Sequence, residues 1–68
     1  MVALGEAIRR ARQAQDISQE MLALVAGVDR SYVGRVERGD NNVALLTLVR
    51  LCEALGTQPS SLLAEAGL

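Results

Sequence analysis

Residues 18–39, SQEMLALVAGVDRSYVGRVERG, decide the fold of this 68-residue chain. Ser18 is a preferred helix N-cap because its hydroxyl accepts a hydrogen bond from a backbone N–H of the first turn. Leu22 and Val25 follow at the spacing of a short amphipathic helix and are expected to face the core. Gly27 ends this helix just after Val25, because glycine readily adopts the left-handed conformation found at helix C-termini. The stretch therefore begins with a helix and a tight turn.

A second helix follows the turn directly. Asp29 is its expected N-cap, the helix reaches about Glu37, and Gly39 closes it. Val33 and Val36 share one side of this helix and are expected to anchor it in the core. Capping is expected to occupy Asp29, and Glu37 lies near the buried side. Both acidic residues are thus diverted from the outer surface of the helix.

The opposite side of the second helix carries arginines. It holds Ser31, Gly34, Arg35 and Arg38, with Arg30 at its edge. A planar guanidinium matches O6 and N7 of guanine in the major groove of DNA. Gly34 costs about 1 kcal/mol relative to alanine in mid-helix, which we interpret as a close approach to a partner's surface. Residues 18–38 therefore predict a helix-turn-helix whose second helix enters the major groove.

Three further helices and no strand are predicted outside this motif. The first spans about residues 2–13, a fourth covers about 44–55, and a short fifth begins at Pro59 and ends near residue 67. The positions of the first and fourth helices expected to face the core are Leu4, Ile8, Ala11, Leu45, Leu48, Leu51, Cys52 and Leu55. The sequence predicts an all-α, five-helix bundle in a single domain over residues 1–68.

Composition bears on both stability and function. Half of the residues are apolar but the only aromatic residue is one Tyr, so the core must consist of aliphatic side chains. A chain of this length buries a small core and gains stability from oligomerisation. The formal net charge of −1 counts against a nucleic-acid-binding protein. That interpretation therefore depends on the local arrangement of the arginines.

The sequence lacks the residues that several classes of function require. One Cys and no His exclude an internal disulfide and a structural zinc site. The sequence has no phosphate-binding glycine loop and no nucleophile with a visible base, so we expect neither an enzyme nor a cofactor or small-molecule ligand. The longest apolar run, Met21 to Val28, is too short to span a membrane. The N-terminus does not read as a signal peptide, and we expect a cytoplasmic protein.

The chain resembles the Cro/repressor-type helix-turn-helix family, also called the XRE family, which has a lambda-repressor-like fold and bacterial regulators among its members. The resemblance covers about residues 4–63 and rests on Arg12, Ile17–Gln19, Leu22–Ala23, Gly27–Val28, Val33, Val36–Glu37, Gly39, Leu48, Leu51 and Ala54–Gly56. Ala44, Leu46 and Cys52 depart from it, where the family usually has a cap, a polar residue and an alanine. The resemblance implies that Gln19 anchors a DNA phosphate and that Arg12 and Glu37 form a structural ion pair.

The remaining DNA contacts are predicted from the helix face and the loop behind it. Arg30 and Arg35 are expected at base edges, and Ser31 at a base or a phosphate. The residues expected at the DNA backbone are Tyr32, Arg38, Asn41 and Asn42. For each of these residues the alternative is an ordinary surface position, and for the two asparagines it is a role in forming the turn.

One recognition helix reads only a few base pairs, so we expect a homodimer on two half-sites about 34–36 Å apart. Leu46 points away from the inward stripe of its helix, which suggests a two-fold interface made of Leu46, Val49, Leu62, Leu63 and Leu68. The expected function is transcriptional regulation from a short palindromic operator, by blocking or recruiting RNA polymerase. The segment Asp29–Tyr32 resembles the controller proteins of restriction–modification systems. An antitoxin, or a protein-interaction domain without DNA binding, is the alternative.

Overall fold

The computed structural model describes residues 2–40 and 44–67, and within these residues it contains five α-helices and no strand. The helices are α1 (Val2–Ala14), α2 (Gln19–Ala26), α3 (Arg30–Arg38), α4 (Leu45–Leu55) and α5 (Pro59–Glu65). The predicted all-α, five-helix fold is therefore confirmed, and the predicted helix ends are within one residue of the observed ends for the first four helices. None of the described helices has the length and apolar character needed to cross a bilayer.

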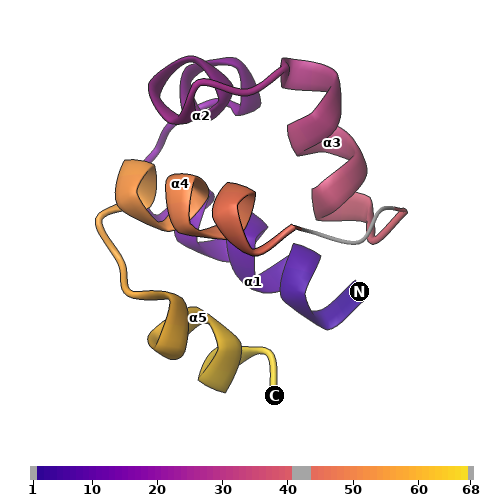
Figure 1. Ribbon diagram of the computed structural model, residues 1–68, viewed down its shortest axis with the longest axis vertical. Coiled ribbons are helices and arrows are strands. Elements are labelled where there is room, and N and C mark those ends of the chain that lie inside the picture. Colours follow the sequence, from indigo (N-terminus) through magenta and orange to yellow (C-terminus); the bar gives the residue numbers. More distant parts are fainter. Residues whose placement is uncertain (1, 41–43, 68) are drawn as a thin grey trace.

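The helices pack in a compact arrangement of 27 × 22 × 20 Å. Helix α1 packs on α3 and α5, α2 packs on α3 and α4, and α4 also packs on α5. Figure 1 shows α2 and α3 together at one end, α1 and α4 in the middle and α5 at the other end. The largest side chains of the core that these helices enclose are Leu4, Ile8, Leu22, Leu51, Leu62, Val33 and Val36.

Three of the four ends of the two motif helices are capped as the sequence predicts. The hydroxyl of Ser18 accepts a hydrogen bond from the backbone N–H of Met21 at 3.0 Å. Gly27 and Gly39 end α2 and α3 in the left-handed conformation, with φ of 74° and 81°. Because three residues separate α2 from α3, the angle between these helices is set by a tight turn.

Two residues expected in the core lie on the surface instead. The side chains of Val25 and Leu45 are 60% and 75% exposed. The buried side of α2 is narrow and consists of Leu22, Ala23 and Ala26, so that Val25 falls outside it. Leu45 is the first residue of α4, beyond the part of that helix that faces its neighbours. Periodicity alone gave the correct helices but too wide an apolar face.

Helix α1 approaches α3 closely at Gly5, a contact that the sequence did not suggest. A Cβ atom at Gly5 would lie 2.8 Å from the carbonyl oxygen of Glu37 and would also contact that of Val36. Only glycine therefore fits between these two helix backbones without displacement. The close contact places the last turn of α3 directly against α1.

Candidate nucleic-acid interface

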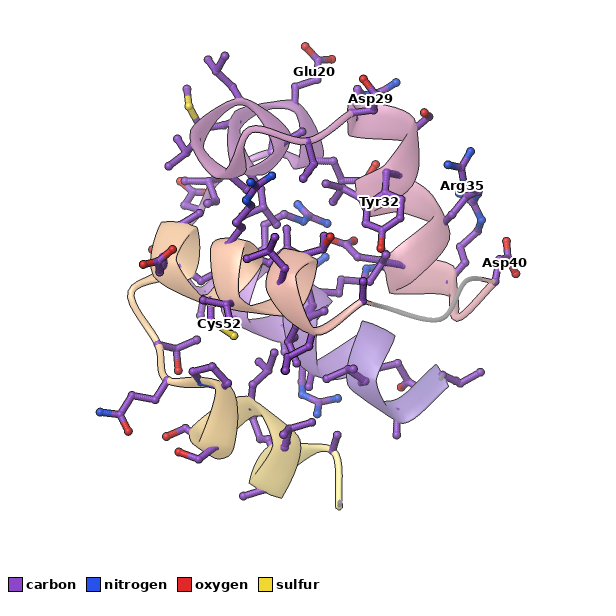
Figure 2. All side chains as sticks on the ribbon, viewed as in Figure 1. Glu20, Asp29, Tyr32, Arg35, Asp40 and Cys52 are labelled. Atoms are coloured by element: carbon purple, nitrogen blue, oxygen red, sulfur yellow. The ribbon has the colours of Figure 1, made fainter. Side chains whose placement is uncertain are left out.

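Helix α3 is divided into a buried side and an exposed side. Val33 and Val36 are fully buried in the core, while Arg30, Ser31 and Arg35 are exposed. In Figure 2 Arg35 projects outward from α3. The predicted anchoring of α3 by its two valines is confirmed, and a row of polar and basic side chains faces solvent. A helix held in this way can enter a groove without loss of core contacts.

Tyr32 lies between the two sides of α3. It is half-buried and packs against the core, and the guanidinium carbon of Arg35 lies 6.0 Å from the centre of its ring. Figure 2 shows Tyr32 nearer the body of the molecule and Arg35 further out. A contact of this length between a cation and an aromatic ring is weakly favourable and restricts the positions available to the guanidinium.

A buried ion pair links α1 to the recognition helix. The guanidinium of Arg12 donates two hydrogen bonds to the carboxylate of Glu37, from Nε at 2.7 Å and from Nη2 at 3.0 Å. Its Nη1 donates to the backbone carbonyl of Ile17 at 3.0 Å. The hydrogen bonds and the charge of Glu37 raise the pKa of Arg12, although burial acts in the opposite direction. One guanidinium thus connects α1, α3 and the segment that leads into α2.

Gln19 joins the same buried network. Its side-chain Nε2 donates to Oε1 of Glu37 at 3.1 Å. Gln19 is the first residue of α2, where backbone N–H groups are left without partners in the helix and the helix dipole favours an anion. The carboxylate of Glu37 therefore fixes the orientation of the side chain that the family resemblance assigns to a DNA phosphate.

The interpretation of Gly34 as a close approach to a partner is not supported. Gly34 is buried, and a Cβ atom there would lie 3.3 Å from Nη1 of Arg38 and 3.7 Å from Oε1 of Gln19. Two side chains of the same molecule fill the space beside this glycine. The absent side chain at position 34 leaves room for contacts between α2 and α3.

The predicted capping hydrogen bond of Asp29 is absent. This residue occupies the N-cap position of α3, but its side chain accepts no capping hydrogen bond and is exposed. Its carboxylate still lies at the positive end of the helix dipole, where a negative charge is favourable. Of the two acids predicted to be diverted from the outer surface of α3, Glu37 is buried as expected and Asp29 is not.

Two arginines of α3 form exposed ion pairs that the sequence analysis missed. Nε of Arg30 lies 3.5 Å from Oε1 of Glu20 in α2. Nε of Arg38 donates to Oδ2 of Asp40 at 3.0 Å. The pairing of Arg38 with Asp40 could have been predicted, because the two residues are only two positions apart in the sequence. The pairing of Glu20 with Arg30 depends on how α2 packs on α3.

The remaining predicted site residues fall into three groups. Asn41, Asn42 and Leu68 lie outside the described residues. Leu62 is 1% exposed and belongs to the core, so it cannot contribute to a dimer surface as predicted; it lies on the side of α5 that packs on α1 and α4. Val49 and Leu63 are half-buried and Leu46 is exposed, next to Leu45, which the predicted interface omitted.

Comparison with known proteins agrees with this geometry. The sequence profile of the helix-turn-helix family matches residues 8–62. The control protein C.SmaI of Serratia marcescens is 45% identical over 65 residues, which are 96% of this chain and 77% of that protein. The crystal structure of the restriction–modification controller protein C.AhdI from Aeromonas hydrophila superposes with a TM-score of 0.88 at 48% identity, over 90% of this chain and 92% of that one.

The clp gene regulator ClgR of C. glutamicum has the same fold, with a TM-score of 0.93 at 33% identity over 97% of this chain and 86% of that one. The family profile covers most of the chain, a control protein is nearly half identical in sequence, and two solved structures of regulators share the chain's fold. This chain therefore belongs to the Cro/repressor-type (XRE) helix-turn-helix family, and it is a DNA-binding transcriptional regulator.

Proposed function

We propose that this chain is a controller protein of a restriction–modification system that binds its own promoter region as a homodimer. The role is supported by similarity to the control protein C.SmaI and to the restriction–modification controller protein C.AhdI. The observation that carries the mode of DNA binding is the division of α3. Its two valines are buried while Arg30 and Arg35 face solvent on a helix of the correct motif.

In this proposal the exposed side of α3 reads bases and its surroundings hold the DNA backbone. Arg30 and Arg35 contact guanine edges in the major groove, and Ser31 contacts a base or a phosphate. The side chains assigned to the DNA backbone are Gln19, Tyr32, Arg38, Asn41 and Asn42. The Gln19 assignment is supported by its fixed amide and its place at the N-terminus of α2.

The double variant Arg30→Ala/Arg35→Ala tests the base-reading role. Affinity for a duplex selected from genomic fragments should fall on the order of thirtyfold or more, because each bidentate contact to guanine discriminates by about 1–3 kcal/mol. The matched control is Arg9→Ala/Arg50→Ala, which removes two exposed arginines from α1 and α4. Unchanged affinity in the first variant, with its fold intact by circular dichroism, would contradict insertion of α3 into the groove.

We place the homodimer interface on α4, around the neighbouring exposed side chains of Leu45 and Leu46. The half-buried Val49 and Leu63 extend this apolar surface. Sedimentation should show a dimer at micromolar concentrations that Leu46→Glu dissociates. The control is Leu24→Glu, which places the same charge on an exposed leucine of α2 and should leave the dimer intact. A monomeric wild-type protein, both free and with DNA, would contradict the proposal.

The controller role itself is tested by where the protein binds. Sequencing of genomic fragments captured by the protein should identify a palindromic site upstream of its own gene, with restriction and methylation genes beside it. Contact with RNA polymerase, or its exclusion, would then follow from the distance between this site and the promoter. Sites scattered far from such genes would favour a general regulator instead.

A second candidate is a protein-interaction domain, and the exposed apolar surface of α2 favours it. Met21, Leu24 and Val25 are all exposed there, and the formal net charge is −1. DNA binding by the wild-type protein separates the two candidates, because a pure protein-binding role predicts that the wild-type protein binds no duplex. A wild-type protein that binds the selected duplex excludes this second candidate.

A further inference from the structure

Acidic side chains already occupy an arginine at each end of the recognition helix. At the start of α3, Nε of Arg30 lies 3.5 Å from Oε1 of Glu20, and at its end, Nε of Arg38 lies 3.0 Å from Oδ2 of Asp40. Figure 2 shows Glu20 beside the start of α3 and Asp40 beyond its end. The four side chains are all more than half exposed.

Such exposed pairs are easily exchanged. A solvent-exposed ion pair contributes little to stability, since both groups are nearly as well solvated when apart. A DNA phosphate offers a guanidinium the same charged oxygen chemistry as a carboxylate does. The base edge or a neighbouring phosphate at Arg30, and the phosphate at Arg38, therefore compete with Glu20 and Asp40 for the guanidinium. The carboxylate that loses this competition stays beside the DNA.

We propose that Glu20 and Asp40 act as intramolecular competitors of DNA, at the base-reading Arg30 and the backbone-binding Arg38, and that they weaken DNA binding and reduce its dependence on salt. This inference rests on the proposed DNA-binding role of α3. Added salt weakens contacts between arginine and phosphate, because counterions released on binding then enter a more concentrated salt solution and their release is less favourable. It also weakens the two exposed ion pairs that compete with those contacts. The two effects oppose each other, so affinity should change less with salt than the number of phosphate contacts implies.

The test uses the full chain and the variants Glu20→Gln and Asp40→Asn, which keep the shape of each side chain and remove its charge. The control is Glu53→Gln, the same change of charge at an exposed position of α4, which packs on α2 and α5. Fluorescence anisotropy measures the affinity for the selected duplex and for an unrelated duplex, over a range of about 0.05 to 0.2 M salt. Thermal melting confirms that each variant is folded.

Glu20→Gln and Asp40→Asn should each tighten binding to both duplexes by about two- to fivefold at the low end of the salt range, the span expected for an exposed pair. The slope of log affinity against log salt should steepen by up to about 0.9 for each phosphate newly engaged. Because the two pairs lie at opposite ends of α3, their effects should add in the double variant. Glu53→Gln should change neither the affinity nor the slope to this extent.

Two other outcomes are distinguishable. If the wild-type protein binds DNA but the two variants respond no more than Glu53→Gln, the competitor role is overturned and the proposed function stands. If no duplex is bound by the wild-type protein or by either variant, the proposed DNA-binding mode is overturned, and this inference falls with it.

Discussion

Two arginine–carboxylate pairs near α3 have similar closest distances and opposite surroundings. The shortest distance between nitrogen and oxygen is 2.7 Å in the Arg12–Glu37 pair and 3.0 Å in the Arg38–Asp40 pair. The side chains of the first pair are 11% and 3% exposed, whereas those of the second are 62% and 57% exposed. Burial, and not distance, separates a pair that holds the fold together from a pair that can be exchanged for a ligand.

The two pairs differ in how well each charged group is solvated once its partner is removed. Arg12 and Glu37 would be left as charges with little access to water, although both also bond to other groups of the protein. Arg38 and Asp40 are already more than half exposed to water, so either charge stays well solvated when the other is removed. The same change, from acid to amide, at the buried and exposed sites therefore compares the loss of one charge in the two surroundings.

The largest effect is expected for Glu37→Gln. The neutral amide leaves the guanidinium of Arg12 without its counter-charge in a buried site, and loss of a buried partner typically costs about 3–5 kcal/mol. Urea denaturation should show a loss of this size, or a protein already unfolded in buffer. Glu20→Gln and Asp40→Asn are the exposed counterparts, and their free energy of unfolding should stay within about 0.5 kcal/mol of wild type. If Glu37→Gln lowered the free energy of unfolding by less than about 1 kcal/mol, burial would not distinguish this pair from the exposed pairs.

Replacement of both buried partners by apolar side chains should recover much of that loss. In Arg12→Met/Glu37→Met no charge is stranded, and such exchanges are often neutral or stabilising by about 1–4 kcal/mol relative to the intact pair. Denaturation of Arg12→Met, Glu37→Met and the double variant completes a cycle. A double variant less stable than either single variant would show that the pair is needed for more than mutual neutralisation.

Gly5→Ala changes the surroundings of the buried pair without removing either charge. The added methyl group would press on the backbone carbonyls of Val36 and Glu37 and displace α1 from α3. Overpacking of this kind costs about 1–3 kcal/mol, measured by urea denaturation. Ala3→Gly, at an exposed position of the same helix, controls for changes in helix propensity. Wild-type stability in Gly5→Ala would indicate that the two helices separate easily at this contact.

The smallest effect is expected at a third exposed pair, away from α3. Nε of Arg10 lies 3.4 Å from Oε1 of Glu65 and joins α1 to α5. Glu65→Gln should change the free energy of unfolding by less than about 0.5 kcal/mol. Its DNA affinity should also match wild type, in contrast to Glu20→Gln and Asp40→Asn. A clear change in affinity would indicate that net charge, and not the position of the acid, controls binding.

Helix ends and the α3 anchor were predictable because local chemistry determines them. Ser18, Gly27 and Gly39 have properties that suit only a few backbone positions, and the spacing of Val33 and Val36 defines one side of a helix. The Arg12–Glu37 pair was predicted from family resemblance, because residues 25 positions apart give no local signal.

The errors concern how helices pack on one another. Val25 and Leu45 are apolar residues typical of a core, but they lie outside the narrow surfaces through which their helices pack. Leu62 was predicted at a dimer interface, but it is buried in the core of the domain. The vicinity of Gly34 is filled by side chains of α2 and α3, which no one-dimensional pattern reveals. The pairing of Glu20 with Arg30 has the same origin, since it exists only once α2 rests on α3.

Arg12 joins three segments through one guanidinium, and this has an evolutionary consequence. The network ties the direction of α3 to α1 and to the segment before α2. We therefore expect a new DNA target to arise through exchanges of side chains on the solvent side of α3. Residues such as Ser31 and Arg35 are exposed and lie outside the core. Their exchange should therefore leave the fold intact. The DNA sequence that is bound can then differ between related proteins while the arrangement of the helices stays the same.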